Sequence, residues 1–181
     1  MRKFSLIIAI ILIIILIGGM FFYFTTASPK KSGEEMRNPA SNLGEEQAIL
    51  QFNPEYIDYL VYSIGGWRLH NPALSDDTPK IKIIADGDTY VSEIINGKIS
   101  TEKKDIENED IIIRTTKKEI VDSLISNDMG GWIKQSVQER RTIVELKASY
   151  TTLFSKGYLS LYKELTGKSF TGSTIRIFGQ V

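Results

Sequence analysis

The sequence predicts an α+β domain, with an antiparallel or mixed sheet of about five strands covered by helices and preceded by one N-terminal transmembrane helix. Three observations support this fold class. The chain begins with a long apolar stretch, its middle contains a strand meander with an Asn-Gly turn, and apolar residues in its last third recur at helical spacing. Hairpin strands followed by strands that alternate with helices are typical of α+β folds.

The uncharged stretch from Phe4 to Phe24 directly follows Met1-Arg2-Lys3. At about 1.5 Å per residue, a helix of this length crosses a hydrocarbon core of ~30 Å. A cleavable signal peptide is the alternative, since Thr25-Thr26-Ala27 supplies small residues, but its apolar core is ordinarily only ~7–15 residues long. We therefore predict a retained anchor at residues 1–27 and a single-pass protein of the cell membrane. The short basic tail favours an extracytoplasmic C-terminal domain.

Residues 28–46 are rich in Ser, Gly, Pro and charged residues, which predicts a flexible tether. Such a coil spans ~25 Å root-mean-square, so the globular domain predicted at residues 47–181 stays near the bilayer. All 22 acidic residues, but not all 22 basic ones, follow the anchor. This balance argues against a nucleic-acid partner, which requires a basic patch. The chain has no cysteine, and therefore no disulfide or thiolate metal site.

The first element predicted with clear end signals is a helix from Pro54 to Ile64. Asn53 is a good N-cap, proline suits the first helical position, and Gly65 ends the pattern. Its apolar residues recur at i, i+3, i+4 and i+7, and they are Ile57, Leu60, Val61 and Ile64. This spacing predicts one buried stripe.

Strands follow this helix. Alternating residues predict a strand at Lys80–Ala85, which ends at Asp86-Gly87-Asp88. Residues Thr89–Ile95 and Lys98–Thr101 then form a hairpin around Asn96-Gly97, which favours a type I′ turn. A further strand is predicted at Asp110–Arg114, where three consecutive isoleucines indicate burial on both faces.

Helices and strands alternate in the rest of the chain. Thr116 and Glu119 have capping-box spacing and predict a helix that continues to Ile125. A Met-Gly-Gly-Trp segment then leads through a short helix to a strand at Thr142–Ala148. The final pattern, from Leu153 to Leu165, predicts a single helix with a wide apolar face. Gly167 ends that helix, before a last strand predicted at Thr174–Phe178.

No catalytic or metal-binding constellation is apparent. His70 is the single histidine, and spacing identifies no partner for it, so we interpret it as a loop residue. Asp76-Asp77 and Asp86-Gly87-Asp88 lack the alternating oxygen pattern of a calcium loop and are interpreted as turns. An anchored hydrolase would require a nucleophile–base pair, and none is visible. We therefore predict no enzyme activity, no catalytic residue, no metal and no cofactor.

Gly-Gly-Trp occurs twice, at residues 65–67 and 130–132, and these segments contain both tryptophans. One interpretation makes them paired mobile lids at a membrane interface or over a cavity. The other makes them helix-ending glycines followed by an anchoring aromatic residue, and we favour this second interpretation.

Residues 80–165 resemble the sterol carrier protein type-two family in the meander with its glycine turn, the strand and helix after Asp110, the strand at Thr142–Ala148 and the closing amphipathic helix. The resemblance implies a non-enzymatic domain that binds sterols, fatty acyl chains or other apolar molecules in a tunnel between the sheet and the terminal helix. It implies that the tunnel is lined by Ile111, Ile113, Leu153, Phe154, Tyr158 and Leu161. A mid-helix glycine costs ~1 kcal/mol relative to alanine, so we expect a strand or a ligand to approach Gly157 closely and count it with the lining.

The sequence thus predicts a membrane-anchored, non-enzymatic domain that binds a lipid or other apolar ligand next to the bilayer. The alternative is an envelope protein-interaction or structural domain with a filled core and no ligand. A carrier requires an apolar cavity, and we expect one of a few hundred Å³ between the final helix and the Ile111–Ile113 strand. A well-packed interaction domain would have no such cavity.

Overall fold

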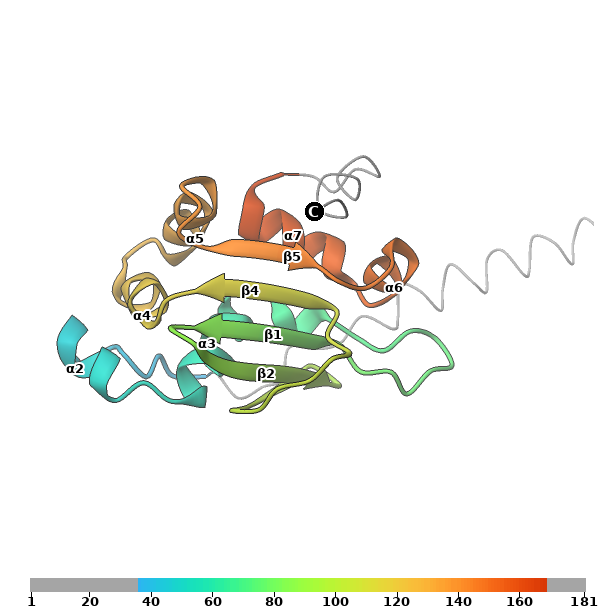
Figure 1. Ribbon diagram of the computed structural model, residues 1–181, viewed down its shortest axis with the longest axis horizontal. Coiled ribbons are helices and arrows are strands. Elements are labelled where there is room, and N and C mark those ends of the chain that lie inside the picture. The colour runs from blue at the N-terminus through green and yellow to red at the C-terminus, as the bar shows by residue number, and fades with distance from the viewer. Residues whose placement is uncertain (1–35, 169–181) are drawn as a thin grey trace, which may run out of the picture. The chain divides into compact units, whose positions relative to one another are not determined.

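The computed structural model describes residues 36–168, which form an α+β domain around an open mixed sheet (Figure 1). The chain divides into two compact units, and all described residues belong to the second, residues 31–181. The predicted anchor and the predicted strand at residues 174–178 lie outside the described residues. Within residues 36–168, no helix combines the length and the apolarity needed to span a membrane.

The sheet has five strands in the order β3-β2-β1-β4-β5. The strands are β1 (Lys80–Ala85), β2 (Asp88–Ile95), β3 (Lys98–Glu102), β4 (Ile111–Thr115) and β5 (Ile143–Leu146). Neighbouring strands are antiparallel except for the central pair, in which β4 runs parallel to β1. In this register Ile83 of β1 lies between Tyr90 and Ile113 on its two neighbours. The five-stranded mixed sheet confirms the α+β part of the predicted fold class.

Both predicted turns of the meander are present. Asn96 and Gly97 have φ angles of 53° and 78°, and Asp86 and Gly87 have 52° and 85°. Each pair joins two antiparallel strands through a two-residue loop. Positive φ at both central residues is the signature of a type I′ turn, whose twist matches that of the flanking strands. The hairpin predicted at Asn96-Gly97 is therefore confirmed.

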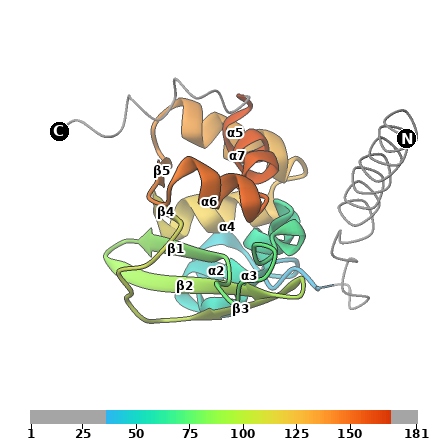
Figure 2. The same ribbon diagram turned by 90° about the vertical axis from the view of Figure 1, so that its right-hand side faces the viewer.

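The two faces of the sheet have different environments. In β1 the side chains of Ile81, Ile83 and Ala85 are fully buried and alternate with partly exposed ones. Figure 2 shows the helices gathered on one side of the sheet. On the opposite face, the Lys82 ammonium donates to the Ile106 carbonyl at 2.8 Å, so the connection from β3 to β4 crosses that face. Ile112 is paired with Lys82 and is buried, as are Ile111 and Ile113, which confirms the strand expected to be covered on both faces.

The helices begin where the sequence provides caps. The Asn53 side chain accepts a hydrogen bond from the Glu55 amide at 2.8 Å, and Thr116 accepts one from the Glu119 amide at 3.1 Å. The helices are α2 (Glu45–Leu50), α3 (Pro54–Ser63), α4 (Lys117–Ile125), α5 (Met129–Gln138), α6 (Tyr150–Ser155) and α7 (Tyr158–Thr166), with a short 3-10 helix η1 (Gly66–Arg68). All four residues of the stripe predicted on α3 are buried.

The second half of the predicted tether is folded. Ala40 is only 1% exposed and belongs to the core, and the Asn38 side-chain amide donates to the Leu124 carbonyl at 2.6 Å. Helix α2 begins at Glu45. These residues pack on the domain in spite of their polar composition, because a polar side chain such as that of Asn38 forms a hydrogen bond with α4.

The single helix predicted from Leu153 to Leu165 is wrong. Gly157 has a φ of 84°, and this left-handed residue separates α6 from α7. The second Gly-Gly-Trp segment, residues 130–132, does not end a helix as the favoured interpretation expected, because it lies in the first turn of α5. The signal missed there is the N-cap Asp128, which accepts a hydrogen bond from the Gly131 amide at 2.9 Å.

Candidate functional site

An apolar hollow lies between the helix-covered face of the sheet and α3, α4, α5 and α7. Its apolar lining includes Val61, Ile83, Ile113, Ile133 and Leu165. The empty space is about 450 Å³ when the open mouth is included, and about 30 Å³ of it accommodates water-sized spheres. A volume of this size holds about two waters. The hollow is therefore open to solvent but narrow.

Hydroxyl groups line one side of this hollow. Thr142 bonds to Thr115 at 2.9 Å and to Ser136 at 2.8 Å, in both cases between side-chain oxygens. The Ser123 hydroxyl donates to the Ile120 carbonyl at 2.7 Å. Because these hydroxyls bond to one another or to the backbone, they leave the adjacent wall largely apolar.

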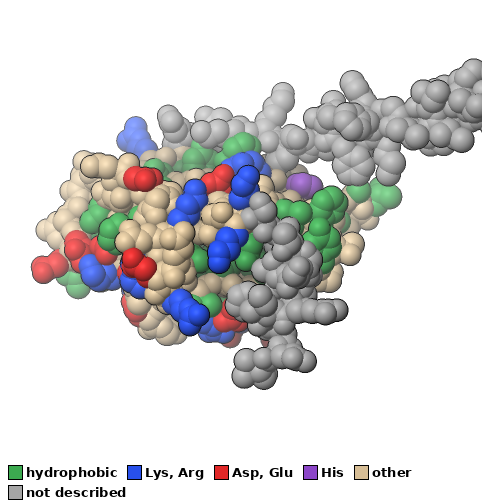
Figure 3. Space-filling model, turned by 90° about the horizontal axis from the view of Figure 1, so that it is seen from above, with side chains coloured by type: hydrophobic (Ala, Val, Ile, Leu, Met, Phe, Trp, Pro, Cys, Tyr) green, Lys and Arg blue, Asp and Glu red, His purple; other side chains and the backbone are tan. Residues whose placement is uncertain are grey.

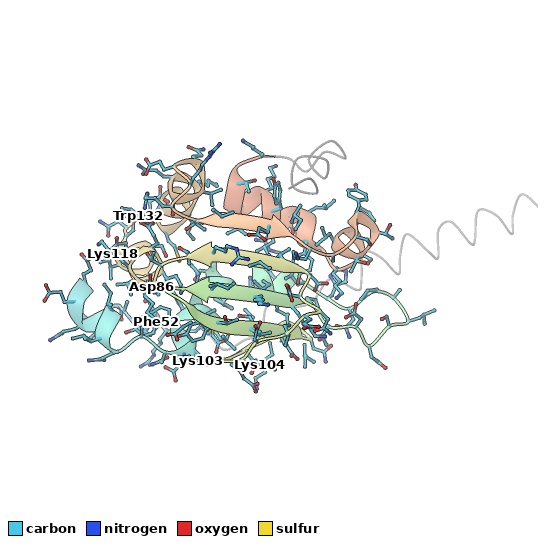
Figure 4. The ribbon with its side chains drawn as sticks, viewed as in Figure 1. Phe52, Asp86, Lys103, Lys104, Lys118 and Trp132 are labelled. Atoms are coloured by element: carbon cyan, nitrogen blue, oxygen red, sulfur yellow. The ribbon has the colours of Figure 1, made fainter. Side chains whose placement is uncertain are left out.

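Among residues 36–168, Trp132 contributes the one buried side-chain nitrogen or oxygen of the lining that has no hydrogen-bond partner. Its indole Nε1 is buried and has no hydrogen-bond partner there. The ring lies 5.4 Å from the guanidinium carbon of Arg141, a cation–π contact. Figure 4 places Trp132 on α5. A buried indole N–H is usually bonded, so this donor is available to a water or to a ligand acceptor.

The charges beside Trp132 are paired. Arg141 forms ion pairs with Glu119, which lines the hollow, and with Glu139 at 2.8 Å. Hydrogen bonds to these two carboxylates raise the pKa of Arg141 further above its usual value. The guanidinium is thus already engaged by two acidic groups, which makes it a poor receptor for an additional anion.

The structure brings together only some of the residues predicted to line a tunnel. Ile111, Tyr158 and Leu161 meet between α7 and the sheet, but the space between them is too small for a water molecule. The cavity of a few hundred Å³ expected at this interface is absent because Val144, Leu146 and the α7 side chains fill it. Of the predicted residues, Ile113 lines the hollow.

The remaining predicted residues lie elsewhere. Leu153 is buried in the core, whereas Phe154 is 62% exposed on α6 and lines neither space. Gly157 does have a close neighbour: a Cβ added there would lie 3.2 Å from the His70 ring and 3.6 Å from the Arg68 carbonyl oxygen. The neighbour is the loop after η1, and neither a strand nor a ligand.

A buried charged cluster escaped the sequence analysis. The Lys156 ammonium is 2.9 Å and 3.1 Å from the two carboxylate oxygens of Asp110, and both residues are almost fully buried. The Tyr158 hydroxyl donates to Asp110 at 2.9 Å, and the Lys80 amide donates to it at 2.8 Å. Burial, with the charge of Asp110 next, raises the pKa of Tyr158 well above its usual value.

This cluster joins the start of β1, the start of β4 and the junction of α6 and α7. Its groups are bonded to one another, to Asp77 at 2.8 Å and to the Thr78 carbonyl at 3.1 Å. A lysine next to a helix-breaking glycine was the signal in the sequence, but its partner lies 46 residues away. Within the described residues, no three histidine, cysteine or carboxylate side chains are placed to hold a metal ion.

Comparison with known proteins adds no assignment, because neither a protein family model nor a curated protein matches the sequence.

Proposed function

We propose that this protein is a membrane-anchored, non-enzymatic domain that binds a lipid or other apolar ligand next to the bilayer. The observation that carries the proposal is the apolar hollow beneath Trp132, which has a solvent-open mouth and a buried indole N–H without a partner among the described residues. Ligand pockets combine an apolar lining with a few polar groups that orient the ligand.

The proposal places the ligand site at this hollow and not at the α7–β4 interface. An acyl chain requires more than the water-sized space present, so binding requires α5 or its side chains to move. Helix α5 is a reasonable moving part, since only Ile133 and Ser136 are buried along it. A resemblance to the sterol carrier protein type-two family remains part of the proposal, supported by the order of meander, strand, helices, strand and closing helices.

Membrane attachment is proposed from the apolar residues Phe4–Phe24, with the domain on the extracytoplasmic side. Protease added to intact cells is expected to degrade the domain, and the purified protein is expected to retain its first residues. Protection of the domain would refute the orientation. A mature N-terminus near Ser28 would refute the anchor.

The alternative function is an envelope protein-interaction or structural domain. The filled interface between α7 and β4 favours it, because a domain of this kind requires no cavity. The two functions differ in whether an apolar molecule occupies the hollow in a saturable way.

Photo-crosslinking of the full chain, reconstituted in phospholipid vesicles, distinguishes them. A long-chain alcohol with a photoreactive group is expected to label peptides from α3, α4 and α5, and an excess of unlabelled alcohol should abolish this labelling. Ile133→Phe narrows the hollow and should reduce labelling severalfold. Val137→Phe, one helical turn later and outside the lining, is the matched control.

Labelling confined to the predicted anchor, with no competition in the domain, would favour the interaction domain. Equal domain labelling of the Ile133→Phe and Val137→Phe proteins would move the ligand away from the hollow.

A further inference from the structure

We infer that one end of the domain is a membrane-docking surface that inserts Leu74, Tyr150 and Phe154 into the interfacial layer of the bilayer. We call these three residues the docking end. The inference concerns the outside of the domain and therefore goes beyond ligand binding in the hollow, although it rests on the proposed anchor.

Leu74 occupies a position that suits neither its backbone nor its side chain. It lies in a turn in which the Ser75 amide donates to the Pro72 carbonyl at 3.1 Å, and its φ is 63°. Glycine or asparagine is preferred at such a left-handed position, which leucine adopts with strain. Its side chain is fully exposed, with a relative accessibility of 106%. Within residues 36–168 the leucine side chain therefore gains no burial to offset this strain. Strained residues of this kind are found at functional surfaces.

An aromatic pair lies on the adjacent helix. Tyr150 and Phe154 are one turn apart on α6, and their rings stack with a centroid distance of 6.4 Å and an interplanar angle of 18°. They are 43% and 62% exposed. Aromatic side chains, tyrosine especially, are favoured at the membrane–water interface, where an apolar ring and a polar tip are both accommodated.

The loop that carries Leu74 is fixed beside α6. Its first part is held by the His70 amide, which donates to the Lys156 carbonyl at 3.2 Å, and its last part by the Lys156 ammonium, which donates to the Thr78 carbonyl at 3.1 Å. Lys156 follows α6 directly. Figure 1 shows the loop and α6 at the same end of the domain, and Figure 3 shows hydrophobic side chains gathered beside the single histidine.

The bilayer is the occupant that the rest of the chain favours. The stretch Phe4–Phe24 can span a membrane, and the tether that follows is short, so the bilayer is present at high effective concentration. The charged residues near these three in sequence have both signs: Asp76, Asp77, Lys147 and Lys156, of which Asp77 and Lys156 form an ion pair at 2.8 Å. A patch without net charge suits insertion into neutral phospholipid better than binding to an anionic surface.

The test uses single cysteines, since the natural chain contains none. The full chain with Leu74→Cys or Phe154→Cys is labelled with an environment-sensitive fluorophore and reconstituted into phosphatidylcholine vesicles that contain spin-labelled lipids. Leu50→Cys is the matched control, because Leu50 is 86% exposed on α2, at the opposite end of the domain in Figure 1.

We expect the fluorophore at positions 74 and 154 to be blue-shifted, and quenched severalfold more than at position 50. Equally weak quenching at all three positions would overturn the docking end and leave a protein partner or residues 169–181 as its occupant. Equally strong quenching at all three would overturn it too, because the domain would then have no preferred face. Failure of the protein to float with the vesicles would refute the anchor, and with it this inference.

Discussion

Helix α7 meets the sheet differently at its two ends. From Tyr158 to Leu165 one side of the helix packs against the sheet in a filled interface, and the buried ion pair between Asp110 and Lys156 lies near its Tyr158 end. At the Leu165 end the same helix borders the hollow, where water-sized space remains. At the end of the sheet where Thr115 lines the hollow, the charges form ion pairs such as those of Asp88 with Lys103 and Lys117, on partly exposed side chains.

The contrast indicates a division of roles along one helix. Filled packing with satisfied buried charges resists change, because removal of any partner leaves a polar group or a void behind. Spare volume with exposed ion pairs tolerates change at little cost. We therefore expect stability to depend on the Tyr158 end and ligand accommodation to depend on the Leu165 end.

The largest effect is expected from Asp110→Ala. It leaves the Lys156 ammonium buried without its principal partner, and breaking a buried pair in this way typically costs about 3–5 kcal/mol. Denaturant unfolding of the variant measures this loss. The double variant Asp110→Leu with Lys156→Met removes both charges and should recover most of the lost free energy of unfolding. A loss under about 1 kcal/mol for Asp110→Ala would show that stability does not depend on this ion pair.

A smaller effect at the same end is expected from Gly157→Ala. The positive φ of Gly157 disfavours any side chain, by about 1–2 kcal/mol, and the new methyl group would also press on His70. Adding His70→Ala should relieve only the contact, so the double variant should remain less stable than His70→Ala alone. Equal stability of these two proteins would show that the left-handed backbone is not required there.

A matched pair of valines compares the two ends directly. Val144→Ile adds a methyl group to the filled interface, where overpacking typically costs ~1–3 kcal/mol. Val61→Ile adds the same group to the lining of the hollow and should change the free energy of unfolding by less than about 0.5 kcal/mol. Thermal unfolding of both proteins reports the difference, and equal losses would mean that the hollow closes in solution.

The smallest effect is expected for Asp88, beside the hollow end of the sheet. Hydrogen bonds from Lys103 and Lys117 lower its pKa from 3.8 to about 2. Because the folded-state pKa is depressed, the stabilisation is present above pH 3.8 and is lost as the pH falls toward about 2. Asp88→Asn should flatten this acid dependence slightly without changing stability at neutral pH much, and salt should weaken the effect. An unchanged acid profile would contradict it.

Sequence reasoning succeeded where the decisive signal was local. The turn at Asn96-Gly97 and the caps Asn53 and Thr116 depend on a few consecutive residues, and all three are present as predicted. The isoleucine run of β4 likewise specified its burial on both faces.

It failed where distant segments decide the outcome. The sequence around Lys156 does not indicate that Asp110 is its ion-pair partner. The break between α6 and α7 at Gly157 likewise lies beside His70, which is distant in sequence. The tunnel residues were predicted from the resemblance of residues 80–165 to a lipid-binding family, and such a resemblance does not indicate how completely neighbouring side chains fill the space. The hollow depends on residues from the sheet and four helices, a combination that no single pattern contains.

The buried charged cluster around Lys156 also affects the order in which the chain folds. Its hydrogen bond to the Thr78 carbonyl closes a span of 78 residues, whereas the hairpins of the meander close through two-residue turns. Contacts between distant residues carry a larger entropic cost and tend to form late. During synthesis, Asp110 therefore has no ion-pair partner until α6 and Lys156 have been made. The first part of the sheet gains this stabilisation only when nearly the whole domain has been synthesised.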